Sequence, residues 1–113
     1  VFLRLRDRLA DAGITVPLVP GILPVTNFAQ VVKFSALCGA TIPPWMSWRF
    51  EGLDDEPATR RLVAAVTAAE QCLSLAREGV ESFHFYTLNR AELTWAICRL
   101  LGAVPCLPAA AAA

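Results

Sequence analysis

The sequence predicts an α/β fold in which short parallel strands alternate with helices, and it predicts that the 113 residues belong to a larger domain. Two apolar runs, at 16–25 and 82–88, are each followed by a helical pattern, which is typical of strands joined by crossover helices. The composition, with 56% apolar and 18% charged residues, provides too few charges to coat a small separate globule. Because two strands do not make a stable sheet, we expect further strands beside them, in a barrel or in an open doubly wound sheet.

The chain begins with an amphipathic helix over residues 2–12, whose apolar side chains share one stripe. The strand that follows, at 16–25, contains prolines, which donate no hydrogen bond to a ladder. We therefore expect Pro17 at the start of this strand and Pro20 or Pro24 near its end, where the chain leaves the sheet.

The second helix is predicted from TNFAQ to Cys38. Thr26 or Asn27 can cap its first turn, and Gln30, three residues after Asn27, completes a capping box. The packing stripe is predicted to consist of Phe28, Val31, Val32, Ser35 and Cys38. Phe34 falls on the other side, one turn after Gln30, where a ring can stack on a planar ligand and an amide can hydrogen-bond to it. The alternative is that a neighbouring segment or subunit buries this second side.

For the second half of the chain, the sequence predicts an irregular segment, a long helix, a strand and a last helix. The irregular segment, 41–56, ends in an acidic cluster that suits the first turn of the helix beginning at Pro57. That helix ends at Gly79, the strand at 82–88 follows, and Asn89 is expected to cap the last helix. The buried stripes are predicted to hold Leu62, Val66, Ala69, Leu73 and Ala76 in the long helix, and Leu93, Ala96, Ile97 and Leu100 in the last.

The charge and cysteine content exclude several classes of function. The formal net charge is zero, so we expect no binding to nucleic acid or to an anionic membrane, and the apolar runs are too short for a membrane span. The four cysteines (Cys38, Cys72, Cys98 and Cys106) form no C-x-x-C pair, and with one histidine a metal site is not expected. We expect reduced thiols that act as small core hydrophobes, in a cytoplasmic protein. No glycine-rich nucleotide-binding motif is present.

The stretch FHFYTLNRAEL, residues 83–93, places polar groups at the end of a buried strand, where α/β folds build their sites. Arg90 opens the last helix, an unfavourable place for a cation because the helix dipole is positive there. This position predicts a carboxylate or phosphate ligand, or, as the alternative, a surface arginine paired with a neighbouring acid such as Glu92 or with a residue outside this piece. Tyr86 either flanks the same pocket or has a partner in the core. His84 shares a face with Tyr86 and is expected to be a core histidine.

Three longer stretches carry a family resemblance: VPGILPVTNFAQ, IPPWMSWRFEGLDDEPATRRLV and GVESFHFYTLNRAELTWAICRLLG. Together they resemble the methylenetetrahydrofolate reductases, from about residue 2 to 104. The resemblance implies that residues 1–107 are the C-terminal portion of the (β/α)8 TIM barrel of that family, followed by a low-complexity tail at 108–113. Strand seven would lie at about 16–23 and strand eight at about 82–88.

The resemblance also implies an activity. The family binds FAD and passes a hydride from NADH or NADPH through the flavin to methylenetetrahydrofolate, which yields methyltetrahydrofolate for one-carbon and methionine metabolism. It places Gln30 and Phe34 in the folate and nicotinamide pocket, with Phe34 stacked on a flat ligand group. It makes Tyr86, Leu88 and Arg90 further substrate contacts, with Arg90 paired to a carboxylate of the glutamate tail of the folate. The acid catalyst and the flavin contacts lie on earlier strands, so no catalytic residue is expected in this chain.

We therefore expect this piece to be inactive without the N-terminal part of the barrel. The alternative is a non-catalytic remnant that acts as a protein-interaction module through its apolar faces, and a different barrel enzyme with the same end motifs is a third possibility. The sequence leaves open the choice between NADH and NADPH, and the oligomeric state, a homo-oligomer included.

Overall fold

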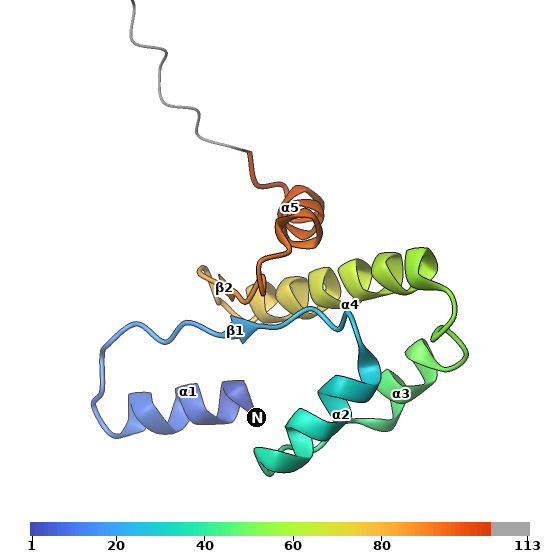
Figure 1. Ribbon diagram of the computed structural model, residues 1–113. Coiled ribbons are helices and arrows are strands. Elements are labelled where there is room, and N and C mark those ends of the chain that lie inside the picture. Colours follow the sequence, from blue (N-terminus) through green and yellow to red (C-terminus); the bar gives the residue numbers. More distant parts are fainter. Residues whose placement is uncertain (105–113) are drawn as a thin grey trace, which may run out of the picture.

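The computed structural model describes residues 1–104, in which five helices surround a two-stranded sheet (Figure 1). In chain order the elements are α1 (Phe2–Asp11), β1 (Gly21–Ile22), α2 (Phe28–Leu37), α3 (Pro44–Phe50), α4 (Pro57–Arg77), β2 (His84–Phe85) and α5 (Ala91–Leu100). The alternation of helices and strands agrees with the predicted order, apart from α3. The predicted low-complexity tail at 108–113 and Cys106 lie outside the described residues.

The two strands pair in parallel, as predicted from their order with the helices. Gly21 lies opposite His84, and Ile22 lies opposite Phe85. The backbone N–H of His84 donates to the carbonyl of Pro20 at 3.0 Å, and the N–H of Tyr86 donates to that of Ile22 at 2.9 Å. Both strands therefore end at the same edge of the sheet.

The strands are much shorter than the predicted spans at 16–25 and 82–88. Pro20 comes directly before β1 rather than near its end, and it contributes its carbonyl to the ladder. Pro24 follows two residues after β1, and neither proline has an N–H to donate. Within residues 1–104, β1 pairs with β2 alone, so the remaining residues of the predicted strand have no ladder to join.

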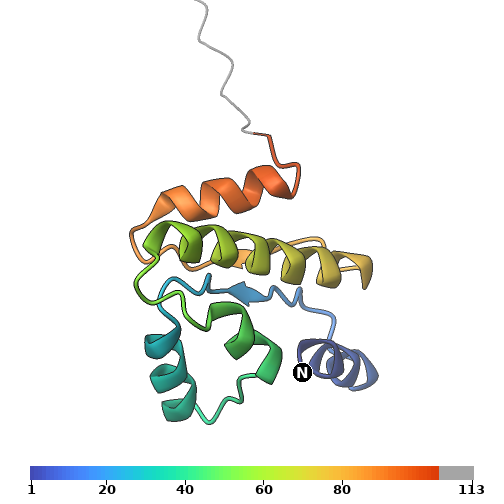
Figure 2. The same cartoon turned by 90° about the vertical axis from the view of Figure 1, so that its right-hand side faces the viewer.

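The helices α4 and α5 form two layers on one side of the sheet (Figure 2). Ile22 of β1 packs with Cys72 of α4 and Ile97 of α5, and the last two are fully buried. Phe83 and Phe85 pack against this cluster from the second strand segment. The core thus lies between the sheet and α4, and α5 closes it.

The buried face of α4 is made of small side chains, which corrects the predicted stripe at every position except Ala69. Leu62, Val66 and Leu73 are 70%, 48% and 44% exposed. The buried residues of α4 are Ala64, Ala65, Thr67, Ala68, Ala69 and Cys72. Small side chains let a helix approach the sheet closely, whereas a search for apolar periodicity gives most weight to large residues. Although α4 has 21 residues, neither it nor another helix in the described part of the chain could cross a membrane.

The stripe predicted for α5 is also only partly buried. Ile97 is completely buried and Leu93 is half-buried, whereas Ala96 and Leu100 are exposed. Packing against α4 and Ile22 of β1 covers a narrower strip of α5 than a full neighbouring layer would.

The segment 41–56, predicted to be irregular, contains the helix α3. Pro44 occupies the first helical position, where a missing N–H is harmless because it would have no partner within the helix. Phe50 at the end of α3 is buried and stacks on Phe28 of α2, with ring centroids 5.7 Å apart. Pro43 and Pro44 together begin a helix here, although two consecutive prolines are typical of a loop.

The prediction that the cysteines act as small core hydrophobes is correct for Cys72 and wrong for Cys38. Cys72 is fully buried, and burial raises the pKa of its thiol, with a smaller contribution from nearby Cys98. Cys98 is half-buried, whereas Cys38 lies exposed at the end of α2. All three are free thiols.

Candidate functional site

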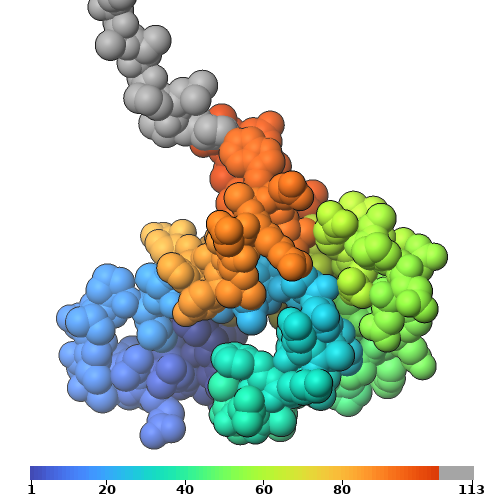
Figure 3. All heavy atoms as spheres, in the orientation of Figure 1, coloured from blue at the N-terminus to red at the C-terminus, as the bar shows by residue number. Residues whose placement is uncertain are grey.

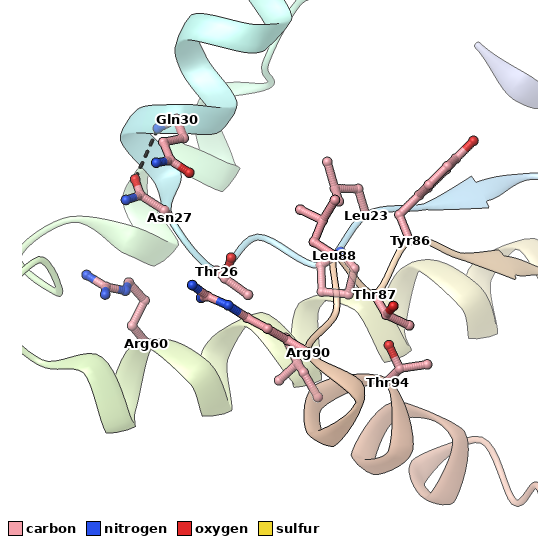
Figure 4. Close-up of a pocket in the computed structure, with 12 residues that line it drawn as sticks. Leu23, Thr26, Asn27, Gln30, Arg60, Tyr86, Thr87, Leu88, Arg90 and Thr94 are labelled. Carbon is pink, nitrogen blue, oxygen red and sulfur yellow. Dashed lines mark hydrogen bonds between the residues drawn. The ribbon is translucent and has the colours of Figure 1, made fainter.

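A pocket of about 330 Å³ lies at the edge where both strands end (Figure 4). It is lined by the segments that follow β1 and β2, together with one residue of α4 and the first turns of α2 and α5. The lining residues are Leu23, Pro24, Thr26, Asn27, Gln30, Arg60, Tyr86, Thr87, Leu88, Arg90, Leu93 and Thr94. Two segments that follow strands 63 residues apart, after Ile22 and after Phe85, therefore share one concave surface.

Four of the five predicted site residues line this pocket, namely Gln30, Tyr86, Leu88 and Arg90. Phe34 does not line it. It lies one turn further along α2 and is 60% exposed. The structure thus brings the α2 start and the segment after β2 together, and it leaves the predicted aromatic ring outside the pocket.

The start of α2 is held by a side-chain cap. The backbone of Asn27 is extended, and its side-chain oxygen accepts a hydrogen bond from the N–H of Gln30 at 3.0 Å. Asn27, and not Thr26, is therefore the capping residue. The Gln30 side chain makes no hydrogen bond within residues 1–104, so its amide is available to a ligand in the pocket.

The turn between β2 and α5 is built differently. Leu88 and Asn89 have φ values of 48° and 62°, in the left-handed region that non-glycine residues seldom occupy. The N–H of Arg90 donates to the carbonyl of Thr87 at 2.9 Å, which closes the turn. Arg90 stands at the N-cap position and makes no side-chain cap. The prediction that Asn89 caps α5 is wrong, because Asn89 adopts the left-handed conformation and the helix begins two residues later.

Arg90 is exposed and is not paired with Glu92, one of the partners that the sequence offered as an alternative to a ligand. The ion pairs in the described part of the chain join Arg6 to Asp7 at 3.1 Å and Arg49 to Glu70. No aspartate or glutamate lines the pocket, whereas two arginines do. The pocket is therefore positively charged and suits an anionic ligand.

Tyr86 forms one wall of the pocket by lying over the backbone of β1. A Cβ atom built on Gly21 would lie 2.6 Å from Cε2 of Tyr86, so glycine is required there for the ring to keep its place. The rings of Tyr86 and His84 make an edge-to-face contact with centroids 4.9 Å apart, which confirms that they share a face. His84 is exposed and is not a core histidine, because no layer within residues 1–104 covers this face of the sheet.

Sequence reasoning missed Arg60, which reaches the pocket from the first turn of α4. Its Nη1 donates to the carbonyls of Asp54 at 2.8 Å and Leu53 at 3.4 Å. One signal could have found it: like Arg90, it is a cation at the positive end of a helix. Its place in a long surface helix concealed that signal.

Comparisons with known proteins agree with the resemblance noted in the sequence. The family model described as methylenetetrahydrofolate reductase matches residues 1–102. The 5,10-methylenetetrahydrofolate reductase of Salmonella typhimurium is 55% identical over 104 residues, which cover 92% of this chain and 35% of that protein. The Escherichia coli enzyme of the same name is 54% identical over the same shares.

A more distant relative shows the same pattern of coverage. A rice protein named probable methylenetetrahydrofolate reductase (NADH) is 27% identical over 92% of this chain, which is 18% of its own length. The chain spans about a third (35%) of the length of the bacterial relatives. The family match over residues 1–102 and these identities establish that the chain belongs to the methylenetetrahydrofolate reductase family.

Proposed function

We propose that this chain supplies the last two strands, seven and eight, and their helices to the (β/α)8 barrel of a flavin-dependent oxidoreductase. The complete enzyme would reduce methylenetetrahydrofolate to methyltetrahydrofolate with a hydride that comes from NADH or NADPH. This chain would contribute part of the folate pocket and would depend on the N-terminal part of the barrel for activity.

The unfilled surroundings of β1 support the barrel. A hollow of about 870 Å³ lies beside this strand, lined by Gly21, Ile22 and Leu23 and by side chains of all the helices except α5. Figure 3 shows the molecule opened between α1 and α2, which both contribute to the lining of this hollow. Across residues 1–104, nineteen large hydrophobic side chains are exposed, against ten buried apolar residues. Further strands would fill such a space and cover such side chains.

The observation that carries the proposal is the pocket, which gathers Gln30, Tyr86, Leu88 and Arg90 at the carboxyl edge of the sheet. In barrels of alternating strands and helices, active sites lie at this edge. We assign Arg90 to a carboxylate of the folate tail, because a guanidinium can bind a carboxylate with two hydrogen bonds. The free amide of Gln30 would hydrogen-bond to the folate, and the exposed ring of Phe34 would extend the wall and stack on its flat part.

The pocket at the carboxyl edge of the sheet does not by itself make a site for FAD. The volume of the pocket, about 330 Å³, is near the low end for drug-sized ligands, and FAD is considerably larger. We therefore assign no flavin contact to this chain. When bound to the complete enzyme, FAD would supply the hydride chemistry, and the residues described here would orient the folate.

Reconstitution tests the proposal. The chain is combined with a separately produced N-terminal part taken from the full reading frame, and the mixture is assayed for flavin absorbance and for NADH or NADPH oxidation. We expect yellow colour and methylenetetrahydrofolate-dependent oxidation in the mixture and neither in the chain alone. Arg90→Ala should raise the Kd for methyltetrahydrofolate and leave flavin content unchanged.

The interaction-module alternative predicts a different result. A chain that is colourless, folded and monomeric alone, and that neither binds flavin nor gains activity with the N-terminal part, would contradict the proposal. Equal loss of flavin and folate binding in Arg90→Ala would contradict the role assigned to Arg90.

A further inference from the structure

We propose that Arg60 and Arg90 form a two-carboxylate site in the pocket, so that this wall recognises a dicarboxylate group of the ligand and not a single anion. The proposal rests on the proposed function, in which that group would be the terminal glutamate of the folate. It assigns a binding role to Arg60 in addition to the role already proposed for Arg90.

The charge of the pocket calls for more than one anion. Arg60 and Arg90 both line it, and no acidic side chain does. The same two arginines also line a second cavity of about 700 Å³ between α4 and α5, so they stand at the boundary of the two cavities. Glu92 lines the second cavity, but it forms an ion pair with neither arginine in the described part of the chain. One bound carboxylate would balance only one of the two guanidinium groups.

Unpartnered polar atoms mark the same pocket. Within residues 1–104, two buried side-chain polar atoms lack a hydrogen-bond partner: Nε of Arg60 and Oγ1 of Thr94. Both residues line the pocket. Buried polar groups are nearly always hydrogen-bonded, and leaving one without a partner destabilises the structure. A ligand with carboxylate oxygens would supply acceptors for both atoms.

Arg60 is also held in place before a ligand arrives. Its Nη1 hydrogen bonds to the carbonyls of Leu53 and Asp54 fix the guanidinium against the loop before α4. Figure 4 shows the Arg90 side chain extending from the start of α5 towards Thr26, on the side of the pocket where Arg60 projects from α4. A group that is already oriented loses less conformational entropy on binding. Arg60 would therefore act as the fixed half of the site and exposed Arg90 as the adjustable half.

Two small probes test the site in the full-length protein that contains this chain. p-Aminobenzoyl-glutamate carries two carboxylates, and p-aminobenzoyl-glutamine carries one and is otherwise nearly identical. Titration calorimetry should show at least about tenfold tighter binding of the glutamate probe, the difference expected for a charge-assisted hydrogen bond. In Arg60→Gln the ratio of the two affinities should fall to nearly one.

The matched control is Arg61→Gln, which removes the same charge one residue further along α4 from a side chain that lines the second cavity but not the pocket. It should retain the preference. Equal affinity of the wild type for both probes would overturn the proposal. An equal loss of affinity for both probes in Arg60→Gln would also overturn the proposal. That result would mean that Arg60 only holds the loop at Leu53 and Asp54.

If circular dichroism shows that Arg60→Gln is unfolded, Arg60→Lys replaces it. Lysine keeps the charge but lacks the Nε donor, so the preference should fall several-fold, and an unchanged preference would contradict the site. Because the probes lack the pterin, they separate the two proposals. A retained preference in a protein without reductase activity would refute the proposed function and leave the dicarboxylate site standing.

Discussion

The two junctions at which a strand passes into a helix lie side by side at one edge of the sheet, yet they are built in opposite ways. After β1, Asn27 in extended backbone caps α2 with a hydrogen bond of 3.0 Å to the N–H of Gln30. After β2, Leu88 and Asn89 occupy left-handed backbone, and Arg90 stands at the N-cap of α5 without making a side-chain cap. The first junction satisfies the local rules of helix initiation, and the second violates them.

If the proposed function holds, the difference reflects a first junction shaped by folding and a second shaped by ligand binding. Left-handed backbone at a non-glycine residue costs about 1–2 kcal/mol, and a cation at a helix start costs a further few tenths to about 1 kcal/mol. These costs fall on the junction that supplies three of the predicted site residues, Tyr86, Leu88 and Arg90. Strain of this kind gathers at sites where the surrounding structure imposes it. Substitutions at the two junctions should therefore separate stability from binding.

The largest effect is expected from Arg90→Asp in the full-length protein. The affinity for methyltetrahydrofolate should fall about 100-fold or more, because an attractive charge becomes repulsive. The stability should rise by up to about 1 kcal/mol, because aspartate is a favoured N-cap residue. Binding titration and denaturant unfolding measure the two quantities.

The control for this change is Arg99→Asp, at the other end of the same helix, where Arg99 lies in the last turn. There an acidic residue should lower stability by about 0.3–1 kcal/mol and leave the affinity unchanged. An Arg90→Asp variant that binds like the wild type would remove the functional explanation for the second junction.

The contact between β1 and the second junction is broken by Gly21→Val. The Cβ atom of the valine would lie 2.6 Å from the Tyr86 ring, so the ring must move. We expect a loss of about 1–3 kcal/mol in the free energy of unfolding, as for overpacking. Adding Tyr86→Ala should recover most of this loss, and losses that simply add would show that the two residues are not coupled.

The cap of the first junction is removed by Asn27→Ala. Denaturant unfolding should show a loss of about 1 kcal/mol, because the N–H of Gln30 loses its acceptor. Asn27→Asp keeps an acceptor and should match the wild type. A loss in Asn27→Asp equal to that in Asn27→Ala would mean that the cap does not stabilise α2.

The smallest effect is expected from Leu88→Asn. Asparagine adopts left-handed backbone more easily than leucine, and the Leu88 side chain is 71% exposed, so little burial is lost. The stability should rise by a few tenths of a kcal/mol to about 1 kcal/mol. Asn89→Leu should lower it by a similar amount. Thermal unfolding measures the stability of both variants. If Leu88→Asn and Asn89→Leu changed the stability in the same direction, backbone strain would not govern this turn.

Much of the architecture follows from local patterns. The sequence predicted the start of one helix at Pro57, the start of another near Thr26, and the parallel pairing of the strands. These features were predictable because prolines, caps and apolar runs act over a few residues. The helix α3 was missed, because its two prolines also signal a loop. For the site, the sequence indicated the segment after β2 from the awkward position of Arg90.

The predictions that failed share one cause, which is that they depend on contacts between distant segments. The pattern of α4 predicted that Leu62, Val66 and Leu73 face the core, and the structure buries an alanine face instead. Arg60 was missed because its role depends on a pocket whose other walls come from distant segments. Both depend on which surfaces meet.

The sequence by itself determined the order of the two strands and of the helices other than α3, the place where α2 begins, and the family to which the chain belongs, because those are read from residue types at short spacing. Only the tertiary structure decided which face of α4 is buried, how far each strand extends, and that Arg60 joins Arg90 in one pocket. The physical reason is that burial, ladder length and local charge depend on contacts between segments far apart in the chain, whose free energies no local pattern contains.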